Sequence, residues 1–222
     1  MTSVSQETIA QRGDPVDAVV LASGGIDSAV CLALAGRSAG TVLALGVDYG
    51  QRNRIELDHL HRLAAAQRCE LLVVRIDMRQ WLSDGLLGSA PPAAGEGTNY
   101  VPGRNLVFLA LAASVAEARG AARIYLGATA ADWHHPDCTE SFFAPFRAAL
   151  SAGLDRAPTL RTPLAGFSKI QVLRLAVRLG VPLELTWSCH LGGPKPCGGC
   201  APCRLRRQTF AELALADPGV PA

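Results

Sequence analysis

No stretch of this sequence is apolar for anything like the ~20 residues that a membrane-spanning helix needs. The net charge of +2 is too small to indicate a surface built for nucleic acid or for an anionic membrane. Residues 1–17 are polar and lack the apolar core of a secretory signal, so we expect a disordered tail there. These absences predict a cytoplasmic protein with no nucleic-acid partner and no membrane partner.

Lysine is almost missing as well, because Lys169 and Lys195 are the only two in 222 residues, whereas arginine is common. A lysine retained against such a background indicates a specific task, although chance is an equal alternative.

Roughly half of the residues are apolar, which is enough for one compact α/β domain. Short β-branched runs alternate with stretches of helical spacing, and this alternation predicts a Rossmann-like open parallel sheet with helices on both faces. We place the nucleotide-binding α/β domain at residues 18–182 and a small cysteine-rich subdomain at 183–213. The expected strands are 18–21, 41–47, 71–76 and 123–126, and the expected helices are 27–35, 54–68, 104–119 and 168–179.

Residues 83–99 interrupt the alternation, since they are rich in Gly, Ala and Pro and show no periodicity. A loop of this length in a compact domain is usually a lid or a disordered segment.

The sharpest motif is the run Ser-Gly-Gly-Ile-Asp-Ser at residues 23–28, which follows a strand and opens a helix. Two glycines let the backbone approach a ligand closely, and the free N–H groups of the helix start favour an anion. Ser23 and Ser28 add hydroxyl groups, while Asp27 would act through a metal ion or hold the loop. The alternative is a plain glycine-rich turn. The Walker lysine and the spaced-glycine dinucleotide motif are both absent.

Arg104 and Lys169 each stand at the start of an expected helix, where a cation opposes the helix dipole. Both placements are better explained if a polyphosphate lies nearby, because a guanidinium pairs well with phosphate oxygens.

Four of the seven cysteines crowd into the last part of the chain: Cys189, Cys197, Cys200 and Cys203. Their spacing lets four thiolates reach one tetrahedral ion, and a closed set of four sulfurs is typical of structural zinc. A redox C-x-x-C pair and an iron–sulfur cluster are the alternatives.

The 23–28 run resembles the PP-loop of the ATP-pyrophosphatases, which cleave ATP between the α and β phosphates and hold the leaving pyrophosphate in this loop. From Val19 to Phe210 the chain further resembles the 7-cyano-7-deazaguanine (preQ0) synthase family of queuosine-type biosynthesis. The carrying segments are residues 23–28, 48–52, 100–105, 136–138 and 185–189.

This resemblance implies ATP-dependent conversion of 7-carboxy-7-deazaguanine and ammonia to the nitrile, through an adenylated acid and then an amide. It also implies a homodimer, Mg²⁺ with the ATP and one structural Zn²⁺ per chain. The implied nucleotide contacts are Ala22, Ser23, Gly24, Gly25, Ile26, Asp27, Ser28, Asp48, Tyr49, Gln51 and Arg104. Ser23, Asp27, Ser28, Arg104 and Lys169 are the implied catalytic residues.

The base is expected to meet the loop after the fourth strand, through Asp132, Trp133, Asp137 and Cys138. Either aspartate could instead form a turn beside Pro136, and Cys138 could act covalently or only line the pocket. The family's usual Asn-Ala-Val-Asp-Tyr-Ser-Gly-Tyr-Pro-Asp-Cys is here one residue shorter, with Trp-His-His in place of Tyr-Ser-Gly-Tyr.

That departure leaves open a paralogue that adenylates another deazapurine acid or uses another amine acceptor. A zinc-ribbon nucleic-acid-binding module is a rival of a different class. It would need a basic face, and it gives no reason for the 23–28 motif.

Overall fold

The structure, a computed structural model, describes residues 13–83, 85–87 and 100–219. Most of the expected 83–99 loop and residues 1–12 of the expected tail therefore lie outside the described residues. Of residues 13–17, Val16 is buried and its N–H donates to the carbonyl of Arg119 at 3.1 Å. The packed chain thus begins shortly before the boundary expected at residue 18.

The core of the molecule is a five-stranded, wholly parallel sheet with the strand order β3-β2-β1-β4-β5. This is the predicted Rossmann-like sheet, and the fold class is confirmed. The chain forms β1, β2 and β3 in order towards one edge of the sheet and then returns to the other side of β1 to form β4 and β5. The strand order therefore reverses between β1 and β4. The strands are Ala18–Leu21 (β1), Val42–Asp48 (β2), Glu70–Arg75 (β3), Arg123–Leu126 (β4) and Thr159–Arg161 (β5).

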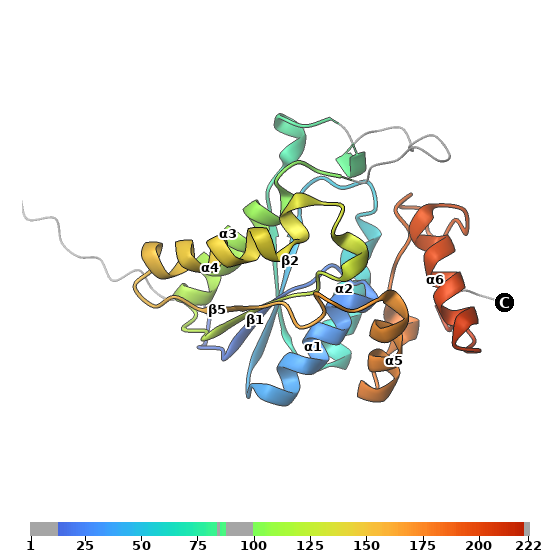
Figure 1. The fold of residues 1–222 in the computed structure, drawn as a ribbon, viewed down its shortest axis with the longest axis horizontal. Helices are drawn as coiled ribbons and strands as arrows, with labels where there is room; N and C mark the ends of the chain where they lie inside the picture. Colours follow the sequence, from blue (N-terminus) through green and yellow to red (C-terminus); the bar gives the residue numbers. More distant parts are fainter. Residues whose placement is uncertain (1–12, 84, 88–99, 220–222) are drawn as a thin grey trace, which may run out of the picture.

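Helices cover both faces of the sheet. Figure 1 shows α3 and α4 together on one side and α1 and α5 on the other, with α6 beyond α5. The helices are Ile26–Ser38 (α1), Ile55–Ala66 (α2), Arg104–Ala118 (α3), Glu140–Gly153 (α4), Lys169–Leu179 (α5) and Ala201–Glu212 (α6). Single 3₁₀ turns are formed by Met78–Gln80, Gly85–Leu87, Ala130–Asp132, Pro136–Cys138 and Leu183–Leu185.

The central position of β1 in the sheet explains why its sequence is a continuous apolar run. Val19 and Leu21 pack into the core beneath α3 and α4, whereas Ala18 and Val20 pack into the core beneath α1, α2 and α5. Successive side chains of a strand point to opposite faces, so a central strand covered on both sides must be apolar throughout. The motif at residues 23–28 therefore follows a strand that is buried at every position.

A buried arginine of α6 joins the start of the cysteine-rich segment to the residues that follow α6. The Arg206 guanidinium donates to the carbonyl and hydroxyl oxygens of Thr186 and forms an ion pair with Asp217 at 2.7 Å.

Among the described helices, none has the length and apolar character required to cross a membrane.

Candidate active site

A large cavity of about 1080 Å³ opens at the carboxyl ends of the central strands. Leu21 of β1, Val47 of β2 and Leu126 of β4 contribute to its floor. In open α/β sheets ligands bind beyond the carboxyl ends, where the strand order reverses. Here that position is the junction of β1 and β4, and the 23–28 loop lies in it.

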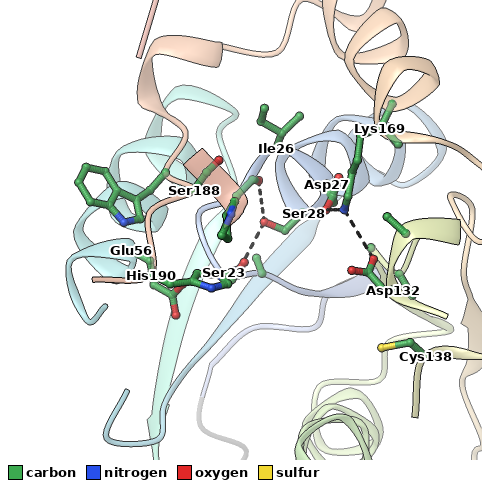
Figure 2. A pocket seen from close by; sticks show the side chains of 18 of the residues that line it. Ser23, Ile26, Asp27, Ser28, Glu56, Asp132, Cys138, Lys169, Ser188 and His190 are labelled. Atoms are coloured by element: carbon green, nitrogen blue, oxygen red, sulfur yellow. Dashed lines mark hydrogen bonds and ion pairs between the residues drawn. The ribbon is translucent and has the colours of Figure 1, made fainter. Parts of the chain in front are cut away.

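The 23–28 loop has the backbone geometry of an anion cradle. Gly24 has φ +82°, and a Cβ added there would lie 2.4 Å from the carbonyl oxygen of Glu56. The Ser28 hydroxyl accepts from the Ser23 N–H at 3.3 Å and donates to the Gly25 carbonyl at 3.0 Å, as Figure 2 shows. Ser28 is buried and closes the loop on itself, so its hydroxyl holds the loop's shape. The space at the start of α1 suits phosphate oxygens.

Lys169 lies between two carboxylates at one side of the cavity. Its Nζ is 2.7 Å from Asp27 and 3.6 Å from Asp132 (Figure 2). Burial raises the pKa of Asp27, and the nearby lysine opposes this shift. Burial alone would lower the pKa of Lys169, but the two carboxylates reverse the effect and raise it. The lysine therefore stays a cation, and the structure brings together three residues that are far apart in sequence.

Arg104 projects into the cavity from the first turn of α3, after Gly103 in the left-handed conformation with φ +64°. It donates to the Tyr49 hydroxyl at 3.4 Å. Desolvation acts against the charged guanidinium, but Tyr49, Glu56 and Asp137 together raise its pKa. The cavity thus holds a second, permanently charged cation.

Glu56, which the sequence analysis did not single out, also lines the cavity. One of its oxygens accepts from Gln51 at 3.0 Å and the other accepts from Asn53 at 2.7 Å. Burial raises the pKa of Glu56 to about 7, while these hydrogen bonds and Arg104 oppose the shift. The only sequence signal was an acidic residue in the first turn of a helix, which is common for structural reasons alone.

The other predicted nucleotide contacts divide into two groups. Ala22, Ser23, Gly25, Ile26 and Tyr49 border the cavity. Asp48 and Gln51 are buried beside it: Asp48 pairs with Arg54 at 2.9 Å, and Gln51 positions Glu56.

The four predicted substrate contacts are not all brought together. Asp132 and Cys138 line the cavity, whereas Trp133 is 54% exposed and does not. Asp137 lies outside the lining as well, and its carboxylate accepts the backbone N–H of Asn105 at 2.9 Å. It therefore caps the start of α3 from within the Pro136–Cys138 turn.

Two histidines of the altered loop, His134 and His135, line the cavity. The His135 ring stacks on Tyr100, with centroids 5.4 Å apart. Asp132 accepts both the N–H and the hydroxyl of Thr129, at 2.9 and 2.7 Å, and this capping box fixes the shortened loop.

Cys138 is buried, and its sulfur accepts from the Asn105 side chain at 3.0 Å. Burial, together with the negative charges of Asp137 and Asp132, raises the pKa of this thiol to about 12. A thiol is a nucleophile only as the thiolate. The environment of Cys138 therefore suits a pocket-lining group better than a nucleophile.

The four C-terminal cysteines converge, with all four sulfur atoms within 4.8 Å of one another. The sulfurs of Cys197 and Cys203 are 4.0 Å apart, as expected if both reach one ion over ~2.3 Å bonds. Backbone N–H groups point at the sulfurs, for example from Cys200 to Cys197 at 3.3 Å, and such donors stabilise thiolates. This donor set fits a single tetrahedral metal ion.

The cysteine cluster is connected through Trp187 to the 23–28 loop, which is called the phosphate loop below. The backbone N–H of Trp187 donates to the Gly24 carbonyl at 2.9 Å, and the indole N–H donates to the Cys189 carbonyl at 2.7 Å. The ring also packs against His59 of α2, with centroids 4.8 Å apart. One residue therefore contacts both candidate sites, the loop through its backbone and the cysteine cluster through its side chain.

A parallel sheet, a glycine loop closed by Ser28 at the switch point and cations facing that loop define an α/β nucleotide-binding protein of the PP-loop class. The particular family follows from comparison with known proteins. The model of the family described as "Queuosine biosynthesis protein QueC" matches residues 17–214, and the chain belongs to this family. The resemblance predicted from the sequence is thus confirmed.

Curated relatives match over nearly their whole length. A 7-cyano-7-deazaguanine synthase from Synechococcus sp. (strain CC9311) is 41% identical over 221 residues, covering 92% of this chain and 98% of the relative. The protein named 7-cyano-7-deazaguanine synthase 1 from Sphingopyxis alaskensis is 40% identical and covers 90% and 96%.

Solved structures share the fold at low identity. An NMN synthetase from Francisella tularensis superposes with a TM-score of 0.54 at 19% identity, covering 90% of this chain and 78% of that one. The U34-tRNA thiolase NcsA from Methanococcus maripaludis, solved with its [4Fe-4S] cluster, gives 0.53 at 14% identity, covering 90% and 66%.

Proposed function

We propose that this chain uses ATP to convert 7-carboxy-7-deazaguanine and ammonia to 7-cyano-7-deazaguanine, as the names of its relatives indicate for them. The observation that carries the proposal is the cavity. The cavity is lined by the phosphate loop on one side and by polar side chains on another. It is large enough for a second, purine-sized ligand. A carboxylate is a poor electrophile and an amide oxygen a poor leaving group. Each half of the reaction therefore needs activation by ATP, and the protein supplies positioning and charge.

The nucleotide roles follow from the charges around the loop. The N–H groups at the start of α1 would receive the leaving pyrophosphate, with Ser23 beside them and Ser28 holding the loop. Lys169 and Arg104 would neutralise charge that develops on the phosphates. Asp27, which already holds Lys169, is the carboxylate we propose to face Mg²⁺.

On the substrate side, Asp132 and Cys138 are the proposed contacts of the deazapurine. His134 and His135 line the cavity, and we propose them, rather than the exposed Trp133, as the aromatic side chains that face the base. Asp137 would act through α3 by keeping Arg104 in place.

For the cysteine cluster we propose one structural Zn²⁺ per chain. Four sulfurs within 4.8 Å suit one ion, whereas an iron–sulfur cluster distributes its thiolates over several irons and holds them further apart. We also propose a homodimer, testable by light scattering, and a cytoplasmic site of action, where thiols stay reduced.

The test is mass spectrometry of the products formed from purified protein, ATP, ammonium and 7-carboxy-7-deazaguanine. We expect the nitrile together with AMP and pyrophosphate, and the amide as an intermediate. ADP and phosphate in place of AMP would contradict the proposed ATP cleavage, even if the nitrile formed.

A second candidate is a paralogue acting on another deazapurine acid or another amine. The altered loop favours it, because His134 and His135 lie at the cavity wall where they would meet the ligand. Running the same assay with related acids and amines in competition separates the two candidates.

A further inference from the structure

One side of the cavity contains polar atoms that lack partners among the described residues. The amide oxygen of Asn53 and the Nδ1 atom of His190 are both buried without a hydrogen bond. Asn53 is 1% exposed, and both residues border the same cavity as Glu56. A buried acceptor without a partner costs about 1–3 kcal/mol of stability. Such atoms are therefore expected where a ligand supplies the missing hydrogen bond.

These three residues come from two segments that pack together. Asn53 donates to Glu56 at 2.7 Å, and a Cβ on Gly192 would lie 3.3 Å from the Cα of Asn53, so the segment after His190 touches Asn53. The backbone of Glu56 also lies against the phosphate loop, where its carbonyl oxygen leaves no room for a side chain on Gly24. The acceptors are therefore next to the place where an adenylate would form.

We propose that Asn53, Glu56 and His190 form the binding site for ammonium, and that the Glu56 carboxylate removes its first proton. This inference rests on the proposed function. A carboxylate, an amide oxygen and an imidazole nitrogen supply acceptors from separate side chains, which suits a tetrahedral cation. A planar purine edge would instead need parallel acceptors from one group.

The proton balance is as follows. Ammonium gives one proton to Glu56, and the freed nitrogen lone pair attacks the carbonyl carbon of the acyl-adenylate. A C–N bond forms, the C–O bond to AMP breaks, and AMP leaves with that electron pair. The nitrogen then releases its second surplus proton to solvent, which leaves the neutral amide.

The electrostatic surroundings of Glu56 agree with this role. The titratable groups that interact with it are Arg104 from α3 and Tyr49 from the loop after β2, and His190 from the cysteine-rich segment lines the same cavity. Its pKa of about 7 lets the carboxylate both accept and release a proton near neutral pH.

The experiment compares Glu56→Gln with the wild type at pH 7, measuring two quantities. One is the KM for ammonium chloride, at constant ionic strength and with saturating ATP and acid substrate. The other is the acid-dependent exchange of pyrophosphate into ATP without ammonium. We expect the ammonium KM to rise about tenfold or more, because a charge-assisted hydrogen bond is lost, while exchange stays within about twofold.

Raising the pH should partly rescue the variant, since free ammonia then needs no proton acceptor. Asp58→Asn is the matched control, because Asp58 is an exposed carboxylate in the same helical turn. It should change neither quantity. Asn53→Ala, which removes the unpartnered oxygen, should raise the ammonium KM and leave exchange intact.

An unchanged ammonium KM in Glu56→Gln would overturn the site. So would a rise confined to the KM of the acid substrate, which would assign Glu56 to the purine edge, or an equal loss of exchange, which would make its role structural. Absence of exchange in the wild type would instead remove the proposed function, and this inference with it.

Discussion

Gly24 shows how strongly a single position can constrain the phosphate loop. Its φ of +82° and the 2.4 Å approach of the Glu56 carbonyl leave no room for a side chain. Gly24→Ala should therefore destabilise the protein by on the order of 1–3 kcal/mol through backbone strain, and should abolish ATP cleavage. Urea denaturation and an AMP assay measure the two effects.

Gly36 provides the control for that substitution. It lies within α1, exposed, with nothing within 4 Å of an added Cβ. Gly36→Ala should stabilise the protein by about 0.5–1 kcal/mol, since alanine is the better helix former. If both variants changed stability alike, the special geometry of the loop would not be the cause.

Glu56 also makes a prediction about pH and stability. Its pKa in the folded protein is about 7, above the ordinary value of ~4.3. A group that holds its proton more tightly when folded contributes stability that is full below the unfolded pKa and is lost as the pH rises through the folded pKa. Between about pH 4 and 7, the free energy of unfolding of the wild type should therefore fall relative to that of Glu56→Gln. Parallel curves from urea denaturation across this range would refute the shifted pKa.

The residues that form the site were only partly predictable from the sequence. Ser23 and Asp27 belong to a motif whose meaning is local, so the sequence alone indicated them. Asn53 and Glu56 do not, because an asparagine and a glutamate near a helix start usually serve as caps. The importance of Asn53 comes from its burial and its unpartnered oxygen, and that of Glu56 from its place in the cavity; both depend on how distant segments pack.

At the scale of elements, the start of α3 depends on Asp137. This carboxylate accepts the Asn105 N–H, so Asp137→Ala should cost about 1 kcal/mol of stability, as for a lost helix cap. Asp137→Asn keeps an acceptor and should be milder. If Asp137 instead recognised the base, the asparagine variant would raise the KM of the acid substrate about tenfold or more, as expected for the loss of a charged acceptor. Measuring stability and KM for both variants separates the roles.

The helix α5, predicted at 168–179 and observed at Lys169–Leu179, was predicted to within one residue because its signals are local. Ser168 accepts the Gln171 N–H, and Gly180 ends the helix with φ +69°. The strand β5 and the helices α4 and α6 were not predicted. Pro145 lies inside α4 and argues against a helix, and β5 has only three residues. Helix α6 begins at Ala201, with Cys200 as its N-cap, so it starts within the cysteine motif, where the metal-ligand spacing obscures the helical pattern.

At the scale of the molecule, metal removal should affect both sites. Cys197→Ser should lose the bound ion, loosen the segment around Trp187 and then weaken ATP binding, since Trp187 contacts the Gly24 carbonyl. Cys69→Ser is the control, because Cys69 lies outside the cluster. Elemental analysis, tryptophan fluorescence and ATP titration give the three readouts. Unchanged ATP affinity in a metal-free variant would show that the two sites are independent.

The meeting of the site residues is a property of strand order. Asp27 follows β1, Asp132 follows β4, and Lys169 begins α5, yet the β1–β4 junction brings them together. The sequence predicted a parallel sheet but not which strands adjoin. It could therefore indicate these residues singly but not the lysine between two carboxylates.

The bond from Trp187 to Gly24 has a consequence for how the protein is made. Trp187 lies 163 residues after Gly24, so the phosphate loop leaves the ribosome well before its partner. Contacts so distant in sequence form late, because closing the intervening chain costs entropy. A nascent chain would hold its loop without this support until the cysteine segment arrives, and the supply of metal would then set when nucleotide binding matures.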